Sequence, residues 1–145
     1  MELVIKGFDE LTTRELYEIL KARTEIFVVE QNCIYNDLDD RDGLSLHVFM
    51  RDEKGIAAYL RVLPRGVYDE NVRIGRVITV RRGVGLGKKL VEAGLDVARE
   101  RLNAETVTIS AQTHAIGFYE KCGFETISEV YMEEDIPHVK MIRKL

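Results

Sequence analysis

A glycine-rich and basic stretch near the middle of the chain offers the clearest chemistry. Residues 82–88 read RGVGLGK, with β-branched residues before them and apolar residues at helical spacing after them. The glycines are therefore predicted to lie where a strand ends and a helix begins. Glycine lets the backbone approach a ligand closely, and the first N–H groups of a helix favour phosphate oxygens. The stretch predicts a site for a phosphate-bearing small molecule.

Two familiar phosphate-binding motifs do not fit this stretch. A P-loop needs Ser or Thr after its Gly-Lys pair to hold magnesium, whereas Lys89 follows Lys88 here. A dinucleotide fingerprint, GxGxxG, would have its third glycine at Lys88, and it would open a βαβ unit rather than lie in mid-chain. The P-loop interpretation fails, and the dinucleotide interpretation is weak.

The overall composition narrows the class of protein. The chain has 145 residues, of which 46% are hydrophobic, and we expect one domain over residues 1–145. A formal net charge of −4 gives no basic field, so nucleic acid is not an expected partner. No apolar run could span a bilayer and no signal peptide is recognised, so we expect no membrane partner and a cytoplasmic location. Cys33 and Cys122 are expected to be reduced.

Hydrophobic periodicity predicts the elements that position the glycine-rich stretch. Strands are expected at residues 2–6, 46–50, 56–63, 73–80, 105–110, 124–131 and 138–142. Helices are expected from the capping box of Thr12 and Glu15 to about Val28, over residues 85–102 and over residues 113–122. Residues 25–31 fit a helix end or a buried extended run equally. A helical crossover makes strands 73–80 and 105–110 parallel, so the order predicts an α/β fold with a mixed sheet.

An acidic loop is predicted at residues 32–43, between the first helix and the following pair of strands. A calcium loop with Gly43 as its invariant glycine would have to begin at Leu38 rather than at an aspartate, so the EF-hand pattern is not met. A solvated acidic loop is the favoured interpretation, and no metal site is predicted.

A second motif lies one strand and one turn after the glycine-rich helix. Residues 115–124 read AIGFYEKCGF, and residues 82–87 fit the pattern Arg/Gln-x-x-Gly-x-Gly/Ala. This pair of motifs resembles the GNAT superfamily of acetyl-CoA-dependent N-acetyltransferases. Similarity to its ElaA-type branch continues at residues 27–33, 75–78, 129–131 and 136–138. The resemblance implies an α/β (α+β) fold: a GNAT-like, mixed but mostly antiparallel central sheet, with splayed parallel strands 4 and 5, flanked by helices.

The resemblance also implies a reaction and residues for it. The enzyme would move an acetyl group from acetyl-CoA directly to a primary amine of a small molecule or peptide, without a metal; a non-catalytic acyl-CoA-binding module is the alternative. Tyr119 would protonate the departing CoA thiolate, which suits a phenol with a pKa near 10. The positions implied for binding the co-substrate are Ile78, Thr79, Val80, Arg82, Gly83, Val84, Gly85, Leu86, Gly87, Lys88 and Gln112.

The general base and the acceptor are less defined. Strand 73–80 lacks the glutamate that many family members use as a base, which leaves Glu30, His47, His138 or a water chain as candidates. Two acidic loops favour a cationic acceptor, or both loops are merely solvated. The residues of these loops are Asp37, Asp39, Asp40, Asp42, Glu133, Glu134 and Asp135. The co-substrate side has the opposite charge, from Arg81, Arg82, Lys88 and Lys89. The sequence leaves open whether the protein is a homodimer.

Overall fold

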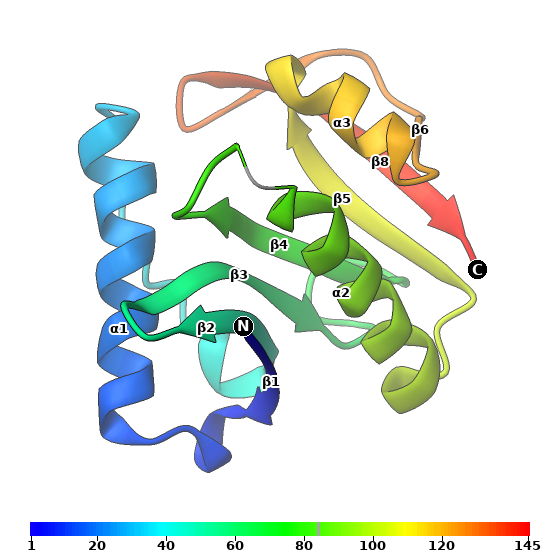
Figure 1. Cartoon of the computed structure of the whole chain (residues 1–145). Helices are drawn as coiled ribbons and strands as arrows, with labels where there is room; N and C mark the ends of the chain where they lie inside the picture. The colour runs from blue at the N-terminus through cyan, green and yellow to red at the C-terminus, as the bar shows by residue number, and fades with distance from the viewer. Residues whose placement is uncertain (84) are drawn as a thin grey trace.

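A computed structural model describes residues 1–83 and 85–145, which form one open sheet with helices on both faces (Figure 1). The strands are β1 (Glu2–Gly7), β2 (Leu46–Asp52), β3 (Gly55–Leu63), β4 (Val72–Thr79), β5 (Thr106–Gln112), β6 (Glu125–Thr126), β7 (Tyr131–Glu133) and β8 (Ile136–Lys144). The helices are α1 (Thr13–Arg23), α2 (Leu86–Leu102) and α3 (Ile116–Lys121), with shorter helical segments η1 (Phe8–Glu10), η2 (Thr24–Glu30), η3 (Asp42–Leu44) and η4 (Thr113–Ala115). The strand order is β1-β2-β3-β4-β5-β8-β6, with β7 beside β8.

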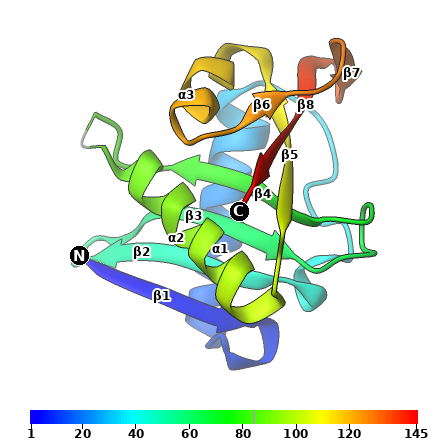
Figure 2. The ribbon, with the colours of Figure 1, turned by 90° about the vertical axis from the view of Figure 1, so that its right-hand side faces the viewer.

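Two apolar cores hold the helices to opposite faces of the sheet. Figure 2 shows α2 in front of the strands and α1 behind them. On the α1 side, Ile19 packs with Phe49 of β2 in one buried cluster. On the α2 side, a Cβ atom at Gly94 would lie 3.0 Å from Leu60 and 3.2 Å from Ile74, so a glycine is what lets this helix come close to β3 and β4.

The first helix begins as the sequence predicts and ends later. Thr12 accepts a hydrogen bond from the Glu15 amide at 3.0 Å, and the Glu15 carboxylate accepts one from the Thr12 amide at 2.9 Å. This capping box is confirmed. The ambiguous residues 25–31 are mostly helical, because α1 continues into the π-helical segment η2 as far as Glu30. None of the helices in residues 1–83 and 85–145 is long and apolar enough to cross a membrane.

Strands β4 and β5 are parallel and splay apart, as expected. They pair only at Val72 with Val107 and at Arg73 with Thr108, near the start of each strand. Beyond that point β4 remains paired with β3, with a shift of register where Arg76 takes the left-handed value φ +51°. The rest of the β4 edge that faces β5 therefore lacks a strand partner in the described residues. The expected mixed, mostly antiparallel sheet is confirmed.

The C-terminal region differs from the prediction in two places. The expected strand over residues 124–131 is wrong, because β6 ends at Thr126 and β7 begins only at Tyr131. Between them, the Ser128 hydroxyl accepts the Lys140 amide at 2.8 Å, so a side chain takes the place of a ladder hydrogen bond. The expected helix over residues 113–122 starts as the 3₁₀ segment η4 and becomes α3 only at Ile116.

Candidate active site

Two segments that lie far apart in the sequence meet around one cavity of about 350 Å³. The described residues of the glycine loop, 82–83 and 85–87, contribute one part of the lining, and the middle of α3 contributes another. The lining residues are Val77, Ile78, Thr79, Arg81, Arg82, Gly83, Gly85, Leu86, Gly87, Phe118 and Tyr119. The two motifs that stand out in the sequence therefore belong to a single site.

The backbone of the glycine loop has a conformation that glycine favours. Gly83 has φ +80° and Gly85 has φ +73°, and Gly85 is the N-cap of α2. A Cβ atom at either position would meet no atom within 4 Å, so the space beside the loop is open. The first N–H groups of α2 lack acceptors within the helix and can bind an anion. Val84, expected to belong to the same loop, lies outside the described residues.

Aromatic packing connects the loop to Tyr119. A Cβ atom at Gly87 would lie 3.2 Å from Phe118, so the first turn of α2 comes against α3 at this glycine. The rings of Phe118 and Tyr119 pack edge-on with centroids 5.1 Å apart, and Tyr119 packs likewise on Phe124 at 6.0 Å. Burial raises the pKa of the Tyr119 phenol, and the nearby Cys122 adds to this shift. The phenol therefore keeps its proton at neutral pH and is available as a hydrogen-bond donor.

Charged residues at the cavity are arranged differently from the expectation. Arg81 was expected to add positive charge for the co-substrate, but its guanidinium makes two hydrogen bonds of 2.5 and 2.6 Å to Asp52 of β2. Asp52 therefore compensates the charge of Arg81, although Arg81 lines the cavity. Arg82 is exposed and forms an ion pair with Glu30 at the end of η2. Lys88 is exposed on the first turn of α2.

Three residues at the end of β4 and just after it were expected to bind the co-substrate, and two of them line the cavity. Ile78 and Thr79 line the cavity, whereas Val80 is not among the lining residues. The Val80 amide donates to the Ala57 carbonyl oxygen at 2.7 Å, so this N–H is not available to a ligand. The same carbonyl accepts the Arg81 amide at 3.2 Å, and these two bonds hold the turn between β4 and the loop.

Gln112 lies at the end of β5 and is also absent from the cavity lining. Its amide nitrogen donates to the Gln31 side chain at 3.2 Å, and its side-chain oxygen accepts His114 Nε2 at 2.7 Å. The first of these bonds joins the residue after η2 to β5.

The three candidate bases occupy different environments. Glu30 pairs with Arg82 beside the glycine loop. His47 is fully buried, with Nδ1 2.8 Å from the Tyr59 hydroxyl and Nε2 2.9 Å from the Asp42 carbonyl oxygen. Burial lowers the pKa of His47, and both of its ring nitrogens are engaged, so its role is structural. His138 lies on β8 and pairs with Tyr131 of β7 in the β7–β8 hairpin.

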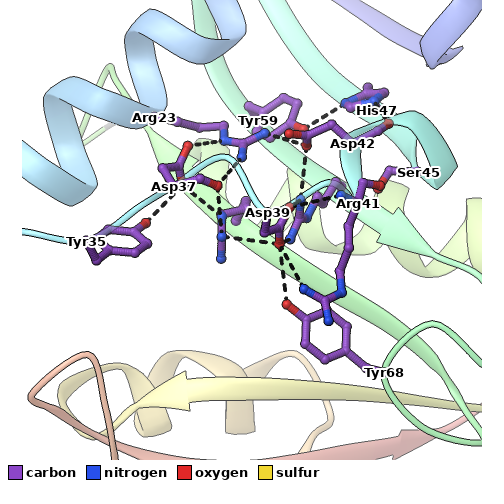
Figure 3. A network of polar contacts seen from close by, with 12 residues as sticks. Arg23, Tyr35, Asp37, Asp39, Arg41, Asp42, Ser45, His47, Tyr59 and Tyr68 are labelled. Carbon is purple, nitrogen blue, oxygen red and sulfur yellow. Dashed lines mark hydrogen bonds and ion pairs between the residues drawn. The ribbon is translucent and has the colours of Figure 1, made fainter.

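A buried network of arginines and aspartates is the main feature that sequence reasoning missed (Figure 3). Arg23 of α1 and Arg61 of β3, both almost fully buried, share Asp42 at 2.6 and 3.0 Å. The network continues through Asp37, at 2.8 Å from Arg23 Nε, and Asp39, at 2.5 Å from Arg61 Nη2. It therefore fixes the irregular segment 32–43 between α1 and the sheet.

The expectation of a solvated acidic loop at residues 32–43 is wrong. Asp37 and Asp42 are buried, and Arg76, next to the register shift in β4, pairs with Asp37 at 2.8 Å. Burial alone would raise the pKa of Asp39, but the hydrogen bonds and charge of Arg61 outweigh it and hold that pKa well below its usual range. These carboxylates already have counter-ions. A sequence signal existed, because Arg61 interrupts an otherwise apolar strand.

The splayed parallel strands, the glycine loop at a helix N-terminus and the tyrosine in the same cavity define a class of protein, the acyltransferases. The chain belongs to the GNAT acetyltransferase family, since it matches the acetyltransferase (GNAT) domain over residues 13–145.

Relatives and solved structures agree with this family. Protein ElaA of Escherichia coli is 37% identical over 140 residues, covering 94% of this chain and 92% of ElaA. A UPF0039 protein of Schizosaccharomyces pombe is 37% identical over 145 residues, covering 97% and 95%. The crystal structure of ElaA has a TM-score of 0.91 at 36% identity, covering 99% and 100%. That of an acyl-CoA N-acyltransferase from Pseudomonas aeruginosa has a TM-score of 0.91 at 38% identity, covering 99% of both chains.

Proposed function

We propose that the protein transfers an acetyl group from acetyl-CoA directly to a primary amine of a small molecule or a peptide. The observation that carries this proposal is the cavity shared by Tyr119 and the glycine loop between Arg82 and Gly87. A thioester of CoA needs a site for its phosphates and a proton donor for its leaving thiolate. The loop and the phenol to which we assign these tasks line this one cavity.

The residues around the cavity fit the charge and shape of CoA. The open space beside Gly83 and Gly85 and the first amides of α2 would hold the pyrophosphate, and exposed Arg82, which pairs with Glu30, would add its positive charge by turning to the phosphates. Beyond Arg73, the edge of β4 toward β5 lacks a strand partner in the described residues. Its backbone groups are left for another hydrogen-bonding chain, such as the pantetheine arm.

The proton that the leaving thiolate needs would come from Tyr119. Burial raises the pKa of this phenol, so Tyr119 is protonated before the reaction begins but is a weaker acid than a free phenol. A donor placed within hydrogen-bond reach of the departing sulfur assists cleavage of the C–S bond. The amine attacks the acyl carbon directly, so the chain needs no nucleophile of its own and no metal.

A non-catalytic acyl-CoA-binding module is the second candidate function. It is favoured by β4, which carries no acidic side chain that could act as a base. The two functions differ in their need for Tyr119, because a module that only binds does not require a proton donor. We also propose a cytoplasmic location, which suits the free thiols of Cys33 and Cys122.

The experiment that tests acetyl-CoA binding compares two glycine variants. Gly85→Val should abolish the calorimetric binding of CoA and acetyl-CoA, since a side chain would fill the space beside the loop. Gly66→Val is the matched control: Gly66 also has a positive φ, +86°, and open space around it, but it does not line the cavity. Equal loss of binding in both variants would show that backbone strain at a positive φ, rather than a side chain in the glycine loop, prevents CoA binding. Wild-type protein that binds NAD or ATP but ignores CoA would contradict the proposal.

A further inference from the structure

We propose that Glu133 and His138, on the hairpin of β7 and β8, together bind the ammonium group of the acceptor and remove its proton. The inference rests on the acetyl transfer proposed above. It assigns the acceptor to primary amines that are cationic at neutral pH, and it supplies the base that β4 lacks.

The strand register places the pair on the face of the sheet opposite to Tyr119. Side chains alternate along a strand, so the paired positions of β5, β7 and β8 share one face. The residues on this face are Ser110, Gln112, Tyr131, Glu133, His138 and Lys140. Their neighbours along the strands, Ala111, Val139 and Met141, belong to the core that also contains the buried residues of α2, and Tyr119 packs against that same core.

The sheet between these two faces is incomplete where β4 and β5 splay apart. The strands pair only up to Arg73 and Thr108, so the sheet beyond them is not closed by hydrogen bonds between the two strands. A thioester reached by Tyr119 from one face could therefore meet an amine from the other. This suits aminolysis, because the entering nitrogen and the leaving sulfur occupy different positions around the acyl carbon.

The contacts of the pair leave a place for one proton. His138 Nδ1 lies 2.7 Å from the Ile136 carbonyl oxygen, which can only accept, so Nδ1 carries the hydrogen of the neutral ring. Nε2 is then an acceptor, and it lies 3.4 Å from Glu133 Oε2. Because two acceptors face each other, the pair gains a charge-assisted hydrogen bond when it takes up one proton.

Neighbouring hydroxyl groups hold the carboxylate in place. Ser110 Oγ lies 3.3 and 3.4 Å from the two carboxylate oxygens of Glu133 and 2.5 Å from the Tyr131 hydroxyl. The Tyr131 ring stacks on His138, with centroids 6.2 Å apart and an angle of 19° between the planes. Ser110 and Tyr131 are therefore positioning residues for the pair.

The Glu133 carboxylate forms no ion pair with an arginine or a lysine in the part of the chain that the structure describes. Its side chain is 48% exposed, and among the ion pairs of the described residues it meets His138 alone. By contrast, the aspartates of segment 32–43 that lie in the buried network meet arginines. An ammonium ion would supply the counter-charge that Glu133 lacks. Lys140, near the pair, forms an ion pair with Asp69, and Cys33 contacts the Glu134 carbonyl oxygen. The other titratable groups near the pair are Tyr131, Glu134 and Asp135.

The reaction balances with these groups. The ammonium nitrogen gives one proton to the Glu133–His138 pair, and its freed electron pair forms the C–N bond to the acyl carbon. The C–S bond breaks and its electrons go to sulfur, which takes the Tyr119 proton. The second proton on nitrogen leaves as the amide forms and restores the phenol. The first passes from the pair to solvent.

The test compares Glu133→Gln with Glu134→Gln, a variant of the exposed neighbouring residue with the same change of charge. The acceptors are 1,4-diaminobutane, which is cationic at pH 7, and aniline, which is neutral there. Glu133→Gln should lower kcat/KM for the diamine by about 10²-fold, the usual contribution of a general base, and leave aniline nearly unchanged. Its kcat/KM for the diamine should then rise tenfold per pH unit toward the amine pKa near 10.4, because only unprotonated amine reacts. For wild-type protein, kcat/KM for the diamine should reach its plateau at a lower pH than for Glu133→Gln.

Three results would overturn the inference. Equal effects of Glu133→Gln and Glu134→Gln would indicate that only the overall negative charge of the hairpin matters. Glu133→Gln could instead slow the acetylation of both acceptors by the same factor. Finally, wild-type protein could bind CoA yet acetylate aniline and not the diamine. Calorimetry with CoA and thermal unfolding of each variant show whether the fold and the co-substrate site are intact. Absence of CoA binding by the wild-type protein would instead refute the proposed function itself.

Discussion

Removing the central carboxylate of the buried network should destabilise the protein far more than removing an exposed one. Asp42 is shared by Arg23 and Arg61, whose side chains are 0% and 1% exposed. Breaking a buried ion pair costs about 3–5 kcal/mol, because the partner is left buried and uncompensated. The amide of Asp42→Asn can still accept a hydrogen bond, so we expect the lower end, about 3 kcal/mol. At about 3 °C per kcal/mol for a chain of this size, Tm should fall by about 9 °C.

The assay is urea unfolding at pH 7, with Asp96→Asn as the control. Asp96 also meets an arginine, Arg99, at 3.1 Å, but the side chains are 62% and 49% exposed. An exposed pair of this kind contributes less than about 1 kcal/mol. If Asp42→Asn cost no more than Asp96→Asn, the argument that the network organises segment 32–43 would be refuted.

Acid titration gives a second readout of the same variant. The arginines lower the pKa of Asp42 in the folded protein despite its burial, so this carboxylate favours the folded state above its ordinary pKa near 3.9. That contribution is lost as the pH falls from about 4 through the lower folded-state pKa. Wild-type stability should therefore drop over this range, and Asp42→Asn should lose less of its remaining stability there. Parallel acid-unfolding curves would contradict the shift.

Two further substitutions test the proton donor and the first helix. Tyr119→Phe should lower kcat by about 10²-fold while acetyl-CoA affinity measured by calorimetry barely changes, because only an interaction of the transition state is lost; an unchanged kcat would remove Tyr119 from the mechanism. Thr12→Ala should cost about 1 kcal/mol in urea unfolding, because the N-cap bond to the Glu15 amide disappears. A loss equal to that of the exposed control Thr126→Ala would argue against the cap.

The parts of the site that were predictable are those in which one short segment carries the whole pattern. The glycine loop is set by backbone requirements at Gly83 and Gly85, and the helix after it follows from apolar spacing. The capping box needs only Thr12 and Glu15, three residues apart. Such features are visible in a sequence because their partners are neighbours along the chain.

The features that were not predictable depend on partners far apart in the sequence. Asp42 looks like a loop aspartate until Arg23 and Arg61 are brought to it from α1 and β3. The break between β6 and β7 has a similar cause, because Ser128 bonds to the backbone of Lys140 on another strand. Periodicity cannot distinguish a residue that pairs in a ladder from one whose side chain replaces the ladder.

The splay of β4 and β5 also has a consequence for how the chain folds. Only two residue pairs connect these strands, whereas β1 to β4 and β5 to β8 are each joined by antiparallel ladders. Antiparallel neighbours with short connections, such as β2–β3 and β7–β8, form early, while a parallel pair must wait for its crossover helix. We therefore expect two cooperative folding units, residues 2–79 and 106–144, which α2 docks together. The gap between β4 and β5 that would serve catalysis would then be the last boundary to form and the first to open.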